Sequence, residues 1–181
     1  MADVLKGGES LRELFAALTE HTFQVEFGVA DPPLLEYLTD LLVRFVRVDV
    51  IFRLRDLSGR RLDEVADMLW EAEQREARPQ REAYRHIGDF TLFWVGVYPE
   101  AVSRLKSPDR KDSMLDYFEQ GKRSYYLASQ FDDEPYRAEA PVLRRLSQEF
   151  EICSFGLNRV RTEWERLPGA AGSASSDAER N

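Results

Sequence analysis

Residues Tyr84–Pro99 read YRHIGDFTLFWVGVYP, and this stretch decides the fold that we expect. From Ile87 to Tyr98 it is apolar on nearly every side, so its apolar surface is too wide for an ordinary amphipathic helix. At about 1.5 Å per residue this section spans roughly 18 Å, well short of the ~30 Å hydrocarbon core of a bilayer. The stretch therefore predicts a buried central helix that runs over Pro79–Tyr98.

Two glycines in this helix, Gly88 and Gly96, share one face with Leu92 because the three residues are spaced i, i+4 and i+8. A glycine inside a helix costs about 1 kcal/mol relative to alanine. We expect the close approach of another helix to offset that cost, so this face should be packed tightly.

Composition limits the classes of function. The chain has 181 residues, the size of one domain, and a net charge of −8, which argues against nucleic acid as its main partner. The single cysteine, Cys153, excludes an intrachain disulfide and favours a reducing compartment. The sequence contains neither a run of transmembrane length nor a secretory signal at its beginning, so we expect a cytoplasmic protein without membrane association.

Five further helices are expected around the central one. The start signals are Ser10 in a capping box, Asp31 before two prolines, and Ser107 before Pro108. In the last helix apolar residues alternate at spacings of three and four, which is the seam of a packed bundle helix. The five helices are expected at about Ser10–Thr22, Asp31–Val48, Leu62–Glu76, Ser107–Phe131 and Leu143–Trp164.

Two segments are ambiguous. Phe23–Phe27 alternates apolar and polar residues, and it is either an extended connector or a continuation of the first helix. Val46–Phe52 is either helical or extended. Because the sequence contains no convincing pair of strands, we predict an all-α, single-domain bundle of about six helices over residues 1–167. Residues 168–181, rich in Ala, Ser and Gly, are predicted to be a flexible tail.

The candidate site residues lie where the central helix becomes apolar. Glu82, His86 and Asp89 are spaced i, i+4 and i+7, and three possible ligands on one helix face can begin a metal site. Bundle metal sites usually draw their ligands from several helices, and the one other histidine, His21, ends a different helix, so a polar stripe at the boundary with solvent is the favoured interpretation. We expect no metal, no other cofactor and no catalytic residue.

Asp89 stands between Gly88 and Phe90, where a carboxylate should be partly buried. It is either a general acid or base with a shifted pKa, or a structural carboxylate held by Arg85 or by an arginine of a neighbouring helix. The second interpretation is favoured, because the motifs of nucleotide, zinc and serine-hydrolase sites are lacking. Tyr125 either lines a ligand pocket beside Asp89 or is a core residue with a hydrated hydroxyl.

The central stretch, with the pattern I-G-D-F-x-L-F-x-x-G-x-x-P, resembles a group of bacterial all-helical proteins without an assigned function. The resemblance covers roughly the middle half of the chain and implies a bacterial origin and a widespread fold unit, but no activity. It continues outside the central helix in Phe52–Asp56, Gly59–Leu62, Asp116, Tyr117 and Gly121.

Two functions follow as hypotheses. The leading one is a non-catalytic helical protein that binds another protein or a second copy of itself, because catalytic motifs are lacking and the last helix is regular. The alternative is a bundle that binds a small ligand or a metal, and so includes an enzyme. Its site would lie beside the central helix, with Asp89, His86, Glu82 and Tyr125 as the contacts.

Overall fold

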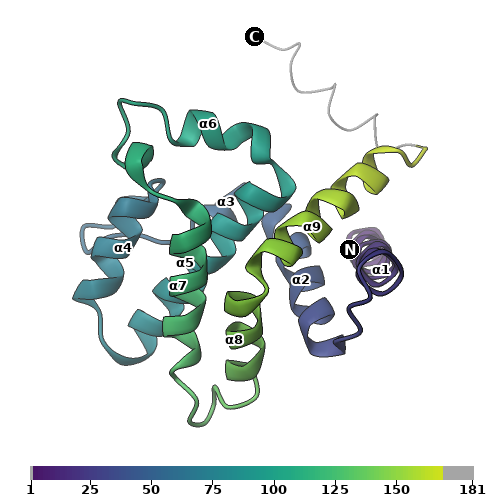
Figure 1. Cartoon of the computed structure of the whole chain (residues 1–181), viewed down its shortest axis with the longest axis horizontal. Coiled ribbons are helices and arrows are strands. Elements are labelled where there is room, and N and C mark those ends of the chain that lie inside the picture. Colours follow the sequence, from purple (N-terminus) through teal and green to yellow (C-terminus); the bar gives the residue numbers. More distant parts are fainter. Residues whose placement is uncertain (1, 169–181) are drawn as a thin grey trace.

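Helix α5 runs through the middle of an all-α bundle (Figure 1). The computed structural model describes residues 2–168, with side chains from Ser10 onward, so the expected tail at 169–181 lies outside the described residues. The α-helices are α1 (Ala2–Glu20), α2 (Pro32–Phe45), α3 (Val48–Ile51), α4 (Val65–Gln74), α5 (Ala77–Val97), α6 (Val102–Leu105), α7 (Tyr117–Ser129), α8 (Ala140–Gln148) and α9 (Phe150–Glu165). A π-helical segment (His21–Glu26) and two short 3₁₀ segments (Pro99–Ala101 and Lys111–Met114) complete the order.

The prediction of a buried central helix is confirmed. Every residue from Ala83 to Phe93 except Arg85 is buried, and α5 packs against α4, α7 and α9. One continuous hydrophobic core joins it to α2 and α8. A helix that is apolar all round needs neighbours on every side, and this requirement sets the architecture.

The close approach expected at the two glycines is also confirmed. A Cβ atom on Gly88 would lie 2.6 Å from ring carbons of Tyr125 on α7. On Gly96 it would lie 3.2 Å from both the Leu157 Cβ and the Ser154 carbonyl oxygen of α9. The missing side chains therefore allow α7 to approach α5 closely at Gly88 and α9 to do so at Gly96.

Two predicted helix starts are wrong. Ser10 lies inside α1, which begins at Ala2, because a capping box does not stop a helix whose preceding residues can continue the hydrogen-bond ladder. Ser107 does not begin a helix either, since its hydroxyl donates to Asp109 at 2.7 Å in a turn. Helix α7 starts nine residues later, where Asp116 caps the amides of Phe118 at 2.9 Å and Glu119 at 3.3 Å. The predicted cap at Asp31 is confirmed by its bond from the Leu34 amide.

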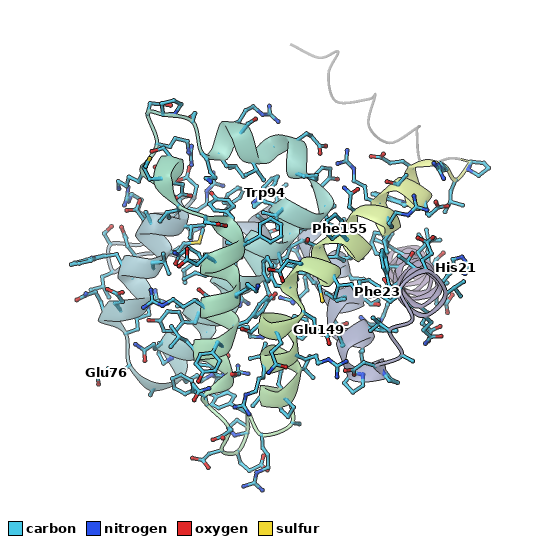
Figure 2. All side chains as sticks on the ribbon, in the orientation of Figure 1. His21, Phe23, Glu76, Trp94, Glu149 and Phe155 are labelled. Carbon is cyan, nitrogen blue, oxygen red and sulfur yellow. The ribbon has the colours of Figure 1, made fainter. Side chains whose placement is uncertain are left out.

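The last predicted helix is two helices. It breaks at Glu149, which Figure 2 labels at the junction of α8 and α9. The expected seam stays buried from Leu143 through Cys153 to Val160. The break allows α8 to pack on α7 while α9 packs on α1 and α5.

The ambiguous segments are both helical. The chain continues from α1 into the π-helix over His21–Glu26, and Val48–Ile51 forms the single turn of α3. The loop that follows carries exposed arginines and an Asp56 side chain that accepts bonds from the Ser58 and Arg60 amides, each at 2.9 Å. This loop is solvated, as its composition indicates.

Candidate functional site

Asp89, at the middle of α5, is completely buried and is surrounded by donors from three helices. Its Oδ1 atom accepts hydrogen bonds from the hydroxyls of Tyr37 on α2 and Tyr125 on α7, each at 2.7 Å. Its Oδ2 atom accepts a bond from the Arg44 guanidinium of α2 at 3.2 Å and lies 4.0 Å from Arg85. We call these five residues the Asp89 cluster.

The charge of Asp89 is stabilised inside the core. Burial by itself raises the pKa of a carboxyl group, but Arg44 and Arg85, followed by the two tyrosine hydroxyls, outweigh it and leave the pKa of Asp89 below its ordinary value. Burial, and then the neighbouring carboxylate, raises the pKa of Tyr37 and of Tyr125. The cluster therefore holds one anion, two neutral phenols and two cations at neutral pH.

The cluster is extended by a second carboxylate. Glu139, just before α8, accepts a bond from the Arg85 guanidinium at 2.8 Å and another from Arg81. The Arg81 guanidinium also stacks over the Tyr136 ring, 4.2 Å from its centroid. The connected groups thus link α2, α5 and α7 to the start of α8.

This arrangement supports the structural interpretation of Asp89. Both of its oxygen atoms have partners, and the partners arrive from helices that are distant in the sequence. The arginine partner expected for a structural carboxylate is present as Arg44, with Arg85 farther away. A general acid or base needs access to a substrate, and Asp89 has no exposed surface.

The other predicted site residues do not join Asp89 in a metal site. His86 is buried beside the rings of Phe45 and Phe90, each 6.2 Å away between centroids. Both ring nitrogens lack a hydrogen-bond partner among the described residues, and burial lowers the pKa of His86 to about 4. Glu82 points outward and pairs with Arg81 at 2.7 Å. Over residues 10–168 no three His, Cys, Asp or Glu side chains are placed to hold a metal ion.

A cavity of about 450 Å³ opens beside the C-terminal section of α5, with wall residues that include Phe93, Trp94 and Val97 of this helix. Trp94 lies in this part of the molecule in Figure 2. The wall residues come from α1, α2, α3, α5, α6 and α9 and from the loops beside them. They are mainly aromatic and aliphatic, and we call this hollow the aromatic cavity: Phe15, Leu42, Phe45, Val46, Val48, Ile51, Phe93, Trp94, Val97, Tyr98, Glu100, Ala101, Arg104, Val160, Arg161 and Trp164.

The aromatic cavity lies apart from the residues that the alternative hypothesis names. A cavity beside the central helix exists, but Asp89, His86, Glu82 and Tyr125 do not line it. Sequence reasoning placed the site at the polar start of the apolar stretch, whereas the hollow lies at its apolar end. Its walls come from elements far apart in the chain, so residue spacing carries no signal for it.

The Asp89 cluster had a weak sequence signal that was missed. Tyr37 and Arg44 are spaced i and i+7 within α2, so both fall on one face of a helix that is otherwise rich in leucine. Polar residues on an apolar helix face require buried partners. That requirement pointed to α2 as the source of a partner for Asp89.

No family model, curated protein or solved structure matches this chain. The resemblance to bacterial helical proteins consequently stays a prediction. Among the described helices, none combines the length and apolarity needed to cross a membrane.

Proposed function

We propose that this chain is a non-catalytic binding protein that takes the apolar part of a small molecule into the aromatic cavity. The observation that carries the proposal is the cavity itself: about 450 Å³, open to solvent, with aromatic side chains from α1, α2, α5 and α9 in its walls. Ligand sites are typically hollows of roughly 300–1,000 Å³ with mainly apolar walls.

The chemistry of the walls supports binding rather than a reaction. The wall residues include neither histidine nor cysteine nor serine, and their one carboxylate, Glu100, is paired with Arg161. The buried titratable residues of α5 are Arg81, Tyr84, His86 and Asp89; none of them lines the cavity, and the Asp89 carboxylate has no surface in contact with solvent.

Tryptophan fluorescence gives a direct test. The chain has three tryptophans; Trp94 and Trp164 line the cavity, whereas Trp70 on α4 is 65% exposed and lies outside it. In a Trp70→Phe protein the neutral fluorophore 1-aminoanthracene should bind at one site per chain and receive energy from the two remaining tryptophans. Native mass spectrometry of the protein as purified should check for a ligand that is already bound.

A blocking variant locates the site. Ala101 is buried in the cavity wall, so Ala101→Phe should fill part of the hollow and weaken binding of the fluorophore at least tenfold. Ala17→Phe is the matched control, because Ala17 is exposed on α1. Circular dichroism must show that both variants fold, and Val97→Phe replaces Ala101→Phe if that protein does not. Unchanged binding in the blocked variant, or no saturable binding to the unblocked protein, would contradict the proposal.

Association with another protein, or with a second copy of the chain, is a second candidate. Val46 and Val48 at the mouth of the cavity are 53% and 62% exposed, and adjoining exposed apolar side chains favour a contact surface. Sedimentation velocity of the wild type and of Val46→Ser/Val48→Ser tests self-association. A single monomeric species for both proteins at high concentration would contradict a homodimer.

A further inference from the structure

We propose that the ligand of the aromatic cavity is an amphipathic anion, with an apolar body inside the cavity and one carboxylate or similar anionic head at Arg104. This inference rests on the proposed function and specifies its ligand class. It comes from the charges on the cavity wall, which consist of Glu100, Arg104 and Arg161 alone.

Arg161 is already engaged within the protein through its Nε and Nη1 atoms, and two carboxylates face its charge. Its guanidinium donates to the Val97 carbonyl at 2.8 Å, to Glu100, and to Glu165 at 2.8 Å. It also lies over the ring of Tyr98, 4.4 Å from the centroid. Arg161 is therefore held in place and neutralised by its own protein.

Arg104 differs from Arg161 in each of these respects. It is exposed on α6, and its side chain has neither an ion pair nor a hydrogen bond with any other residue of the described part of the chain. Glu100 is paired with Arg161, and among the described residues the positive charge of Arg104 has no carboxylate within ion-pair distance. That charge stands out in a chain whose net charge is −8.

A guanidinium at the edge of an apolar hollow selects an anion. Arginine can donate two parallel hydrogen bonds to a carboxylate, and such charge-assisted bonds are stronger than neutral ones. The apolar walls select the rest of the molecule, because removing apolar surface from water is favourable at roughly 25 cal/mol per Å². A molecule with an apolar body and an anionic head can therefore contact the apolar walls and Arg104 at the same time.

A cationic head fits the same site poorly. An aromatic cage for a quaternary ammonium group needs open ring faces and an available negative charge. Here one face of Tyr98 is covered by Arg161, and the carboxylate of Glu100 is paired with the same arginine. The unpaired charge at the mouth, that of Arg104, would repel a cation.

The volume limits the size of the apolar body. At about 30 Å³ per non-hydrogen atom, the volume that one water molecule occupies in the liquid, 450 Å³ holds roughly 15 such atoms. Decanoate is a suitable probe of this size. 1-Decanol and decyltrimethylammonium carry the same chain with a neutral and a cationic head.

The test is displacement of 1-aminoanthracene from the Trp70→Phe protein by each of the three probes, below the concentrations at which they form micelles. Decanoate should displace the fluorophore at a concentration at least tenfold lower than decanol, and decyltrimethylammonium should be the weakest. Higher salt should weaken decanoate alone, because Arg104 is exposed and its attraction is screened.

Arg104→Gln, made in the Trp70→Phe protein, should reduce decanoate to the level of decanol and leave decanol unchanged. The matched control is Arg78→Gln, which removes an exposed arginine at the opposite end of α5 and should change neither probe. Decanol equal to decanoate, a stronger cationic probe, or an Arg104→Gln protein that keeps its preference would overturn the anion inference and leave the proposed function standing. If the neutral fluorophore itself does not bind, the proposed function fails with it.

Discussion

The middle of helix α5, around Asp89, and its C-terminal section, around Trp94, are packed in different ways. Around Asp89 the helix buries a charge, and α2 and α7 supply a donor for each of its oxygen atoms. Around Trp94 the helix is apolar, and the surrounding elements leave a hollow of about 450 Å³. The Asp89 carboxylate is therefore fully enclosed, whereas the apolar section of the helix borders open space.

The two sections of α5 should therefore have different roles, the Asp89 cluster in stability and the aromatic cavity in binding. A buried charge whose partners are removed is strongly destabilising, so the Asp89 cluster should govern the free energy of unfolding. A change of one exposed residue at the mouth of the aromatic cavity should have little effect on the free energy of unfolding. Variants in the two sections of α5 should therefore differ in their effect on stability.

Removing the carboxylate should have the largest effect. Asp89→Ala leaves the Arg44 guanidinium and two tyrosine hydroxyls without their acceptor, and we expect a loss of about 3–5 kcal/mol in the free energy of unfolding. Asp89→Asn keeps the shape and should cost about 1.5–3 kcal/mol. Urea titration measures both.

The matched control for Asp89→Asn is Asp40→Asn, since Asp40 pairs with Arg12 on the surface with its side chain 42% exposed. Its loss should be under about 1 kcal/mol. An Asp89→Asn protein at least as stable as the wild type would show that Asp89 is kept for a function rather than for packing.

Lowering the pH should reduce the free energy of unfolding through His86, which lies close to Asp89 on α5. Burial lowers the pKa of His86 to about 4, so the unfolded chain, with a histidine pKa near 6.5, binds more protons between these values. Stability therefore falls as the pH is lowered through this window, by about 2 kcal/mol between pH 7 and pH 5.

His86→Phe should remove this part of the pH dependence. Urea titrations of both proteins at pH 7 and pH 5 give the comparison, and the carboxylates contribute similarly to both. If the two proteins lose the same stability on acidification, His86 is not the group responsible.

Substitutions of Gly88, next to Asp89, and of Gly96, near the C-terminal end of α5, compare the packing of the two sections directly. Gly88→Ala places a methyl group 2.6 Å from the Tyr125 ring, and we expect overpacking to cost about 1–3 kcal/mol. Gly96→Ala meets its nearest neighbours at 3.2 Å, where a small shift suffices. The helix propensity of alanine, worth up to about 1 kcal/mol, should leave that variant near wild-type stability. Thermal melts that rank the two variants in the reverse order would contradict this comparison.

The smallest loss of stability is expected for Arg104→Gln, and Arg44→Gln is the variant to compare with it. Arg104→Gln changes an exposed, unpaired residue at the cavity mouth and should alter the free energy of unfolding by less than about 0.5 kcal/mol. Arg44→Gln removes a partner of the buried Asp89 and should cost about 1 kcal/mol or more. Equal losses of stability in the two variants would contradict the assignment of stability to the Asp89 cluster and of binding to the aromatic cavity.

The sequence by itself determined the central helix and the fold class. An apolar run that is too short for a membrane and punctuated by two glycines requires surrounding helices whatever their order in the chain. It also indicated that Asp89 would need a partner, because a carboxylate between Gly88 and Phe90 on such a helix is expected to be partly buried. The cap at Asp31 was equally visible, since capping depends on neighbours within one turn.

Only the tertiary structure decided which residues meet. Tyr37, Arg44 and Tyr125 reach Asp89 from 52, 45 and 36 residues away along the chain, and the spacing that puts Tyr37 and Arg44 on one face of α2 does not say which buried group they meet. The break at Glu149 likewise follows from α8 and α9 packing on different helices. The aromatic cavity was the least predictable feature, because a hollow is defined by where separate elements fail to fill space together, and no single stretch of sequence encodes that.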